Sequence, residues 1–70
     1  MDYIDKIKLL RQEKGITQVE LSKELNLSPA AYGLYETRQR RMDIETLVAV
    51  CRYFNVSADS LLDIFPKIKK

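Results

Sequence analysis

The sequence predicts a compact all-α domain built from five short helices. Apolar residues recur at spacings of three and four, which places them on one face of a helix, and no stretch alternates apolar and polar residues for long enough to indicate a strand. Each apolar segment also follows a capping residue and ends at a residue that stops helices. The connections are short, without repeats or a linker, so we expect one domain over residues 1–65 and a short basic tail over residues 66–70.

The first two helices have clear start and stop signals. Asp2 caps a helix expected over residues 2–14, and Gly15 ends it in a left-handed conformation. Residues 17–20, Thr-Gln-Val-Glu, have the pattern of a capping box, in which each of the outer side chains accepts a hydrogen bond from the other's backbone N–H. Asn26 tolerates the left-handed conformation and closes the second helix.

The third helix is expected to begin at Ser28-Pro29, an N-cap followed by proline at the first helical position, and to end near Thr37. The small residue Ser22 lies where the second and third helices would cross closely. Two helices joined by a tight turn at a steep angle leave the outer side of the second one free to enter a groove.

The last two helices follow the same pattern. Asp43 caps the fourth helix and Asn55 stops it, whereas Ser57 caps a short fifth helix that ends before Pro66. The apolar residues of the fourth helix recur at helical spacing as one expected inward stripe: Ile44, Leu47, Val48, Cys51 and Phe54. Across the domain, the residues expected to be buried are Leu10, Leu21, Leu25, Tyr35, Leu47, Cys51 and Leu61.

The composition excludes several classes of protein. A single cysteine forms no internal disulfide, and with no histidine in the chain there is no metal site of the usual kind, no expected cofactor and no nucleophile–base pair for an enzyme. No apolar run approaches the roughly 20 residues that span a bilayer, and the N-terminus lacks the pattern of a signal peptide. We therefore expect a cytoplasmic, non-enzymatic domain without a membrane segment or an evident small-molecule ligand.

The positive charge is unevenly distributed. Residues 1–37 carry five basic and six acidic side chains, although the whole chain has a net charge of +2. The excess comes from Arg38, Arg40 and Arg41 and from the basic tail. A charge run is often only a solvated surface, but arginines that follow a helix and precede a turn are well placed to contact a polyanion.

In the order and spacing of its segments, the chain resembles the phage-repressor and Cro-like helix-turn-helix family, the Xre family of bacterial regulators. The segments that carry the resemblance are "IKLLRQEKGITQVELSKELNLS", "YETRQRR" and "DIETLVAVCRYFNVSADSLL", which together extend from about Tyr3 to Ile64. The resemblance implies a lambda-repressor-like five-helix fold, with the second and third helices as the helix-turn-helix. It also implies double-stranded DNA binding by a bacterial or phage transcriptional regulator, with the third helix in the major groove.

The resemblance assigns roles to individual residues. Arg11 and Glu36 match an ion pair that ties the first helix to the end of the third. The residues that it places toward the bases are Pro29, Ala30, Ala31, Gly33 and Leu34. The residues that it places toward DNA phosphates are Thr17, Gln18, Ser28, Arg38, Arg40 and Arg41.

The chain departs from the family pattern in three ways. The base-facing positions commonly carry polar side chains in relatives, but here they are Pro, Ala, Gly and Leu, which cannot form the bidentate hydrogen bonds that identify guanine or adenine. Arg38 stands where relatives often have glycine, so we expect it to have positive φ. Met42 replaces a frequent proline. We therefore predict that the affinity for DNA comes mainly from phosphate contacts, and that the base sequence is recognised weakly or indirectly.

Two functions stay open at this point. The first is DNA binding, in which helical spacing keeps Tyr32 and Tyr35 in the core rather than stacked on bases. The alternative is a protein-interaction module that docks a partner helix on Ala30, Gly33 and Leu34. Relatives bind two-fold DNA sites as dimers, and the candidate dimer contacts are Leu62, Ile64 and Phe65, which would otherwise cover the core.

Overall fold

The computed structural model describes residues 2–62, and within them the chain forms five helices and no strand, as the sequence predicts. The helices are α1 (Tyr3–Lys14), α2 (Gln18–Glu24), α3 (Ala31–Glu36), α4 (Ile44–Phe54) and α5 (Ala58–Leu62). None of these helices is long and apolar enough to cross a bilayer. The tail and two of the candidate dimer contacts, Ile64 and Phe65, lie outside the described residues.

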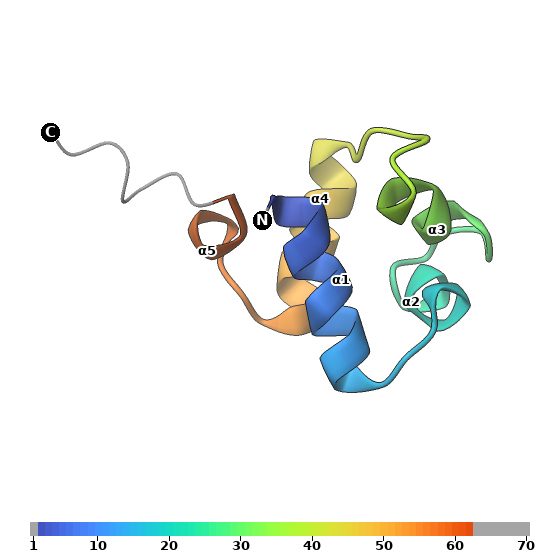
Figure 1. Ribbon diagram of the computed structural model, residues 1–70, viewed down its shortest axis with the longest axis horizontal. Helices are drawn as coiled ribbons and strands as arrows, with labels where there is room; N and C mark the ends of the chain where they lie inside the picture. Colours follow the sequence, from blue (N-terminus) through green and yellow to red (C-terminus); the bar gives the residue numbers. More distant parts are fainter. Residues whose placement is uncertain (1, 63–70) are drawn as a thin grey trace, which may run out of the picture.

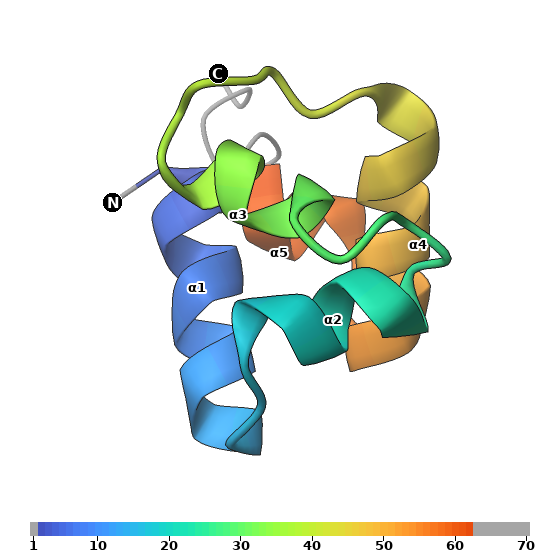
Figure 2. The ribbon, with the colours of Figure 1, turned by 90° about the vertical axis from the view of Figure 1, so that its right-hand side faces the viewer.

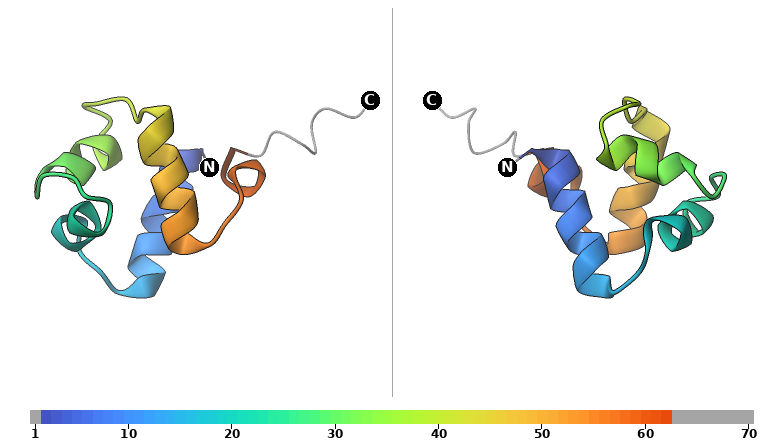
Figure 3. Two further views of the ribbon diagram at one scale, coloured as in Figure 1. Left: turned by 180° about the vertical axis from the view of Figure 1, so that it is seen from behind. Right: turned by 45° about the vertical axis from the view of Figure 1, so that its right-hand side comes forward.

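α1 and α4 lie at the centre of the molecule, with the other helices on either side of them. α2 and α3 pack together on one side, and α5 lies on the opposite side against α1 and α4 (Figure 1). The views from behind and at an angle show the same arrangement (Figure 3). Turned by 90°, the molecule presents α3 and α2 to the viewer, with the α3–α4 loop running along their upper edge (Figure 2). This face therefore carries the helix-turn-helix.

The helix ends are where local sequence signals predict them. Asp2 accepts a hydrogen bond from the Asp5 backbone N–H at 3.1 Å, and Thr17 and Glu20 form both hydrogen bonds of the capping box. Asp43 and Ser57 cap α4 and α5 in the same way. Gly15, Asn26 and Asn55 have positive φ values of 78°, 61° and 56°, and each closes a helix or its turn. These capping predictions are confirmed.

The predicted start of α3 is wrong by two residues, because the first helical residue is Ala31 and not Pro29. Ser28 and Pro29 form a turn in which the Ser28 carbonyl accepts from the Ala31 N–H at 3.0 Å, and the helix begins only at Ala31. No side chain of this segment caps the helix. Instead, the Ser22 hydroxyl on α2 accepts from the Tyr32 backbone N–H at 2.9 Å, and both groups are buried. Because this cap comes from another helix, the spacing of residues within α3 carries no sign of it.

The core lies between all five helices, and it confirms most of the predicted buried positions. Leu21, Leu25, Tyr35 and Leu61 are buried, whereas the remaining three predicted residues are partly buried against the core: Leu10, Leu47 and Cys51. Burial raises the pKa of the Cys51 thiol, in keeping with an apolar role.

The predicted stripe of α4 is partly wrong. Ile44 is 75% exposed and Val48 is 43% exposed, while Thr46 and Val50 are the buried residues of this helix. The inward face is therefore rotated relative to the expected one. Thr46 and Val50 are four positions apart and share the side of α4 that meets the core, whereas Ile44 and Val48, also four apart, share a side that faces outward.

Candidate nucleic-acid interface

The outward face of α3 carries few hydrogen-bonding side chains, as the sequence predicts. Pro29 and Ala30 are exposed in the turn that precedes the helix, and Gly33 and Leu34 are half-buried on the helix itself. Ala31 does not belong to this face, because it is only 7% exposed and packs beside Tyr32 and Tyr35 on the inward side. The expectation that Ala31 faces a partner is therefore wrong. Helical spacing at 100° per residue separates the two sides.

A buried ion pair fixes the C-terminal end of this face to α1. Arg11 Nε lies 2.7 Å from Glu36 Oε2, and the two side chains are only 12% and 4% exposed. A second nitrogen of Arg11 donates to the other carboxylate oxygen at 3.2 Å, and a third donates to the Ile16 carbonyl at 2.8 Å. This pair is the one that the family resemblance implies.

The same carboxylate also holds Gln18, at the start of α2. Gln18 Nε2 donates to Glu36 Oε1 at 2.7 Å, and the side chain is half-buried. Burial raises the pKa of Glu36, but hydrogen bonds from Arg11 and Gln18 outweigh it and hold that pKa below its usual range. The hydrogen bonds that Arg11 donates to Glu36 correspondingly raise the pKa of Arg11. Arg11 and Glu36 are therefore both ionised at neutral pH.

Tyr32 and Tyr35 belong to the core, as predicted, and are not available for stacking on bases. Tyr32 is 1% exposed and Tyr35 is 3% exposed, and their rings meet edge to face with centroids 6.4 Å apart. Burial raises the pKa of Tyr32, so its hydroxyl remains protonated. Their rings support the outer face of α3 from beneath.

The loop after α3 contains the arginine cluster. Arg38 has a φ of 62°, which confirms the predicted left-handed conformation. Its guanidinium group lies 3.0 Å from Asp2 and 3.1 Å from Asp5, so it joins the loop to the first turn of α1. Nothing in the local sequence links residues so far apart in the chain, and the spacing of charges alone missed this contact.

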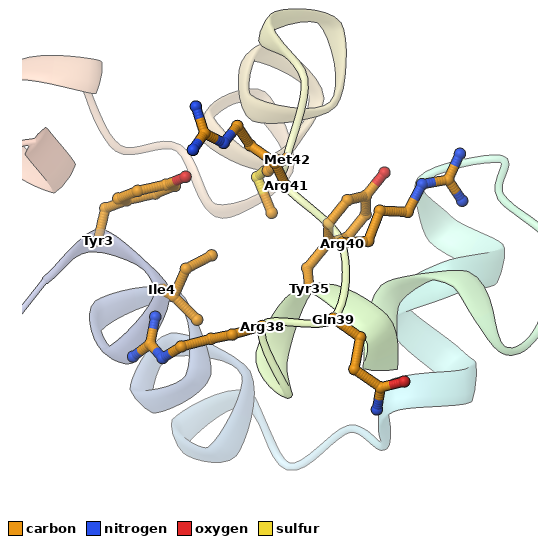
Figure 4. Close-up of a pocket in the computed structure, with 8 residues that line it drawn as sticks. All are labelled: Tyr3, Ile4, Tyr35, Arg38, Gln39, Arg40, Arg41 and Met42. Carbon is orange, nitrogen blue, oxygen red and sulfur yellow. The ribbon is translucent and has the colours of Figure 1, made fainter.

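Arg40 and Arg41 are placed differently. Both are exposed, and neither forms an ion pair with any described residue. Arg38 lies over α1, Arg40 points to the other side toward α2, and Arg41 turns away from both, beside a shallow hollow that Tyr3, Ile4 and Tyr35 also line (Figure 4). Within residues 2–62, the loop therefore has two cations without an ion-pair partner rather than three.

The two hydroxyl residues of the predicted phosphate set lie immediately before α2 and in the turn between α2 and α3. Thr17 is exposed, and its hydroxyl oxygen accepts from the Glu20 N–H, which leaves its proton free to donate. Ser28 is exposed in the turn before α3. The described residues contain no group of three potential metal ligands. The arrangement is suited to binding a large, flat or helical anion.

Comparison with known proteins agrees with this geometry. A helix-turn-helix family model matches residues 7–61. The chain is 26% identical over 72 residues to the HTH-type transcriptional regulator YobD of Bacillus subtilis (strain 168), covering 97% of this chain and 64% of that protein. It is 37% identical over 57 residues to the HTH-type transcriptional regulator ImmR of the same organism, covering 81% of this chain and 45% of that protein.

A solved structure matches over almost its whole length. The P22 c2 repressor protein, crystallised in complex with synthetic operator 9T, superposes with a TM-score of 0.77 at 26% identity. The match covers 89% of this chain and 94% of that chain. By contrast, the chain spans less than two thirds of the length of the curated relatives, with shares of 30% to 64% for the first two. This chain belongs to the helix-turn-helix family of the Xre/Cro/C1 type, whose members are DNA-binding transcriptional regulators and not enzymes.

Proposed function

We propose that this chain binds the major groove of double-stranded DNA through the outward face of α3 and derives most of its affinity from phosphates. The observation that supports this most directly is the arrangement around α3. In Figure 2, α3 lies between α2 and the loop that carries the arginines Arg40 and Arg41, and the outward residues Ala30, Gly33 and Leu34 bring no charged side chain. Small side chains let a helix lie deep in a groove, where cations on its flanks meet the phosphates.

The phosphate contacts are assigned by exposure and pairing. Arg40 and Arg41 supply the main cations, and the exposed hydroxyl groups of Thr17 and Ser28 supply neutral donors. Arg38 contributes less, because Asp2 and Asp5 already compensate its charge. Since its side chain is 49% exposed, these ion pairs hold it only weakly.

A second copy of the chain is part of the proposal. One helix-turn-helix reads about half a turn of the groove, so a two-fold DNA site needs two copies. Leu62, half-buried at the end of α5, and the predicted contacts Ile64 and Phe65 are the residues that we assign to this dimer. Sedimentation that finds a single copy at high concentration, both alone and on duplex DNA, would reject it. As a regulator acting on bacterial or phage DNA, the protein would work in the cytoplasm.

The test is the salt dependence of binding. Fluorescence anisotropy of a labelled duplex of random sequence, titrated at several salt concentrations, gives the slope of log K against log salt. Arg40→Ala and Arg41→Ala are each expected to weaken binding to every duplex and to flatten the slope by about 0.9. Arg52→Ala is the matched control, because Arg52 is also exposed but lies at the far end of α4.

The alternative is docking of a partner helix on Ala30, Gly33 and Leu34. Apolar docking depends little on salt, so it predicts no duplex binding and no effect of the arginine changes. If the unchanged protein does not bind duplex DNA, or if Arg40→Ala and Arg41→Ala leave its affinity intact, the DNA proposal is wrong. Leu34→Ala should alter the preference between duplexes while leaving the salt slope unchanged.

A further inference from the structure

The outward face of α3 has a gap at Gly33. Ala30, Gly33 and Thr37 form the stripe that points away from the core, since Ala31, Tyr32 and Tyr35 point into it. Position 33 is therefore central to the surface that the proposed function places in the groove. It has no side chain of its own.

Gln18 occupies this gap from the neighbouring helix. A Cβ atom at position 33 would lie 2.8 Å from Gln18 Oε1 and 3.5 Å from its carboxamide carbon. Any side chain larger than hydrogen at this position would thus displace the carboxamide. The bare glycine and the glutamine are complementary, and together they place a carboxamide at the centre of a stripe whose own polar side chain, Thr37, already donates its hydroxyl to the Gly33 and Leu34 carbonyls at 3.0 and 3.3 Å.

The orientation of this carboxamide is determined by Glu36. The Glu36 carboxylate only accepts hydrogen bonds, so the NH₂ end of Gln18 must face it, as the 2.7 Å contact shows. The oxygen end is then directed to Gly33. Arg11 holds Glu36 in place from the other side, so the carboxamide rests on a buried, charged support.

We infer that Gln18 is a base-reading residue that replaces the missing polar side chain of α3, an inference that rests on the proposed DNA binding. After donating one N–H to Glu36, the carboxamide keeps one N–H donor and the Oε1 acceptor. An adenine edge in the major groove presents one acceptor, N7, and one donor, the N6 amino group. The remaining pair of groups on Gln18 matches this edge.

A phosphate is a poorer partner for the same group. Phosphate oxygens only accept, so Oε1 would have no role there and would face like charge. No described residue donates a hydrogen bond to Oε1, which leaves it available. The structure therefore favours an A·T base pair in each half-site over the phosphate role that the family resemblance implies for the Gln18 side chain.

Three variants test this inference. Duplexes selected by the unchanged chain from a random-sequence library are re-measured with each base pair replaced in turn. The unchanged chain is expected to prefer one A·T pair per half-site over G·C by roughly 5- to 100-fold. Gln18→Ala should abolish that preference and leave the others. Gly33→Ala should reduce it with Gln18 still present, and because Gly33 is helical this change preserves the fold. Val19→Ala, an exposed neighbour on α2, is the control.

The outcomes separate this inference from the proposed function. If Gln18→Ala weakens binding to all duplexes alike and flattens the salt slope by about 0.9, Gln18 binds phosphate and the inference is wrong. It is also wrong if Gln18→Ala or Gly33→Ala leaves the A·T preference unchanged, or if the unchanged chain binds duplexes without any preference. In these cases DNA binding itself still stands. Only a failure of the unchanged chain to bind any duplex overturns both.

Discussion

Removal of Arg11 should be the most damaging single change to the helix-turn-helix. Arg11→Met leaves the Glu36 carboxylate, which is 4% exposed, with Gln18 as its remaining donor. Breaking a buried ion pair in this way costs about 3–5 kcal/mol in the free energy of unfolding. In a domain of this size, each kcal/mol lowers the melting temperature by roughly 4–8 °C, so we expect a loss of at least about 12 °C.

The stability of the unchanged protein and that of Arg11→Met should depend on pH in opposite directions. In the unchanged protein the pKa of Glu36 lies below its ordinary value of 4.5, so Glu36 stabilises the fold above that pH and loses this effect as the pH falls through the lowered pKa. In Arg11→Met, burial is no longer outweighed and raises the pKa of Glu36, which destabilises the fold above pH 4.5. The difference between the two proteins should therefore be largest at neutral pH, and it should shrink as the pH falls through the raised pKa of Glu36 in the variant and then through its lowered pKa in the unchanged protein.

Urea unfolding followed by circular dichroism at pH 7 and at pH 4 measures this difference. Arg38→Met is the matched control, because its two ion pairs are about half exposed and should contribute at most about 1 kcal/mol. The double change Arg11→Met with Glu36→Met removes the uncompensated charge and should restore much of the stability. A loss below about 1 kcal/mol for Arg11→Met, or one that is equal at both pH values, would refute this reasoning.

Three further changes test other parts of the fold by the same urea unfolding. Ser22→Ala removes the buried acceptor of the Tyr32 N–H and should cost about 1–3 kcal/mol; a loss under about 0.5 kcal/mol would show that the tertiary cap is unimportant. Arg38→Gly should be more stable than Arg38→Ala by about 1 kcal/mol, because φ is 62° there, and equal stabilities would contradict this. Val50→Ala should cost about 2 kcal/mol and Val48→Ala less than about 0.5 kcal/mol, whereas the reverse order would support the stripe predicted from sequence.

The family resemblance supplied the helix-turn-helix and the positive φ of Arg38. The sequence by itself determined the helix caps and stops, apart from the start of α3. These features depend on residues within about four positions of one another, because a cap or a left-handed turn pairs a side chain with the nearby backbone. The capping box at Thr17 and the stop at Asn55 were therefore predictable before any packing was known. The Arg11–Glu36 pair followed only from the family resemblance, since the two residues are 25 positions apart.

Only the tertiary structure decided where the polar groups of the interface lie. The start of α3 depends on a hydroxyl from α2, the charge of Arg38 depends on two carboxylates of α1, and the polar group over Gly33 comes from Gln18. Each of these contacts joins residues from different helices, so it exists only once those helices have packed at a particular distance and angle. The outward face of α3, which has few polar side chains of its own, is thus completed by the Gln18 carboxamide from α2. The spacing of residues along α3 gives no sign of this contact.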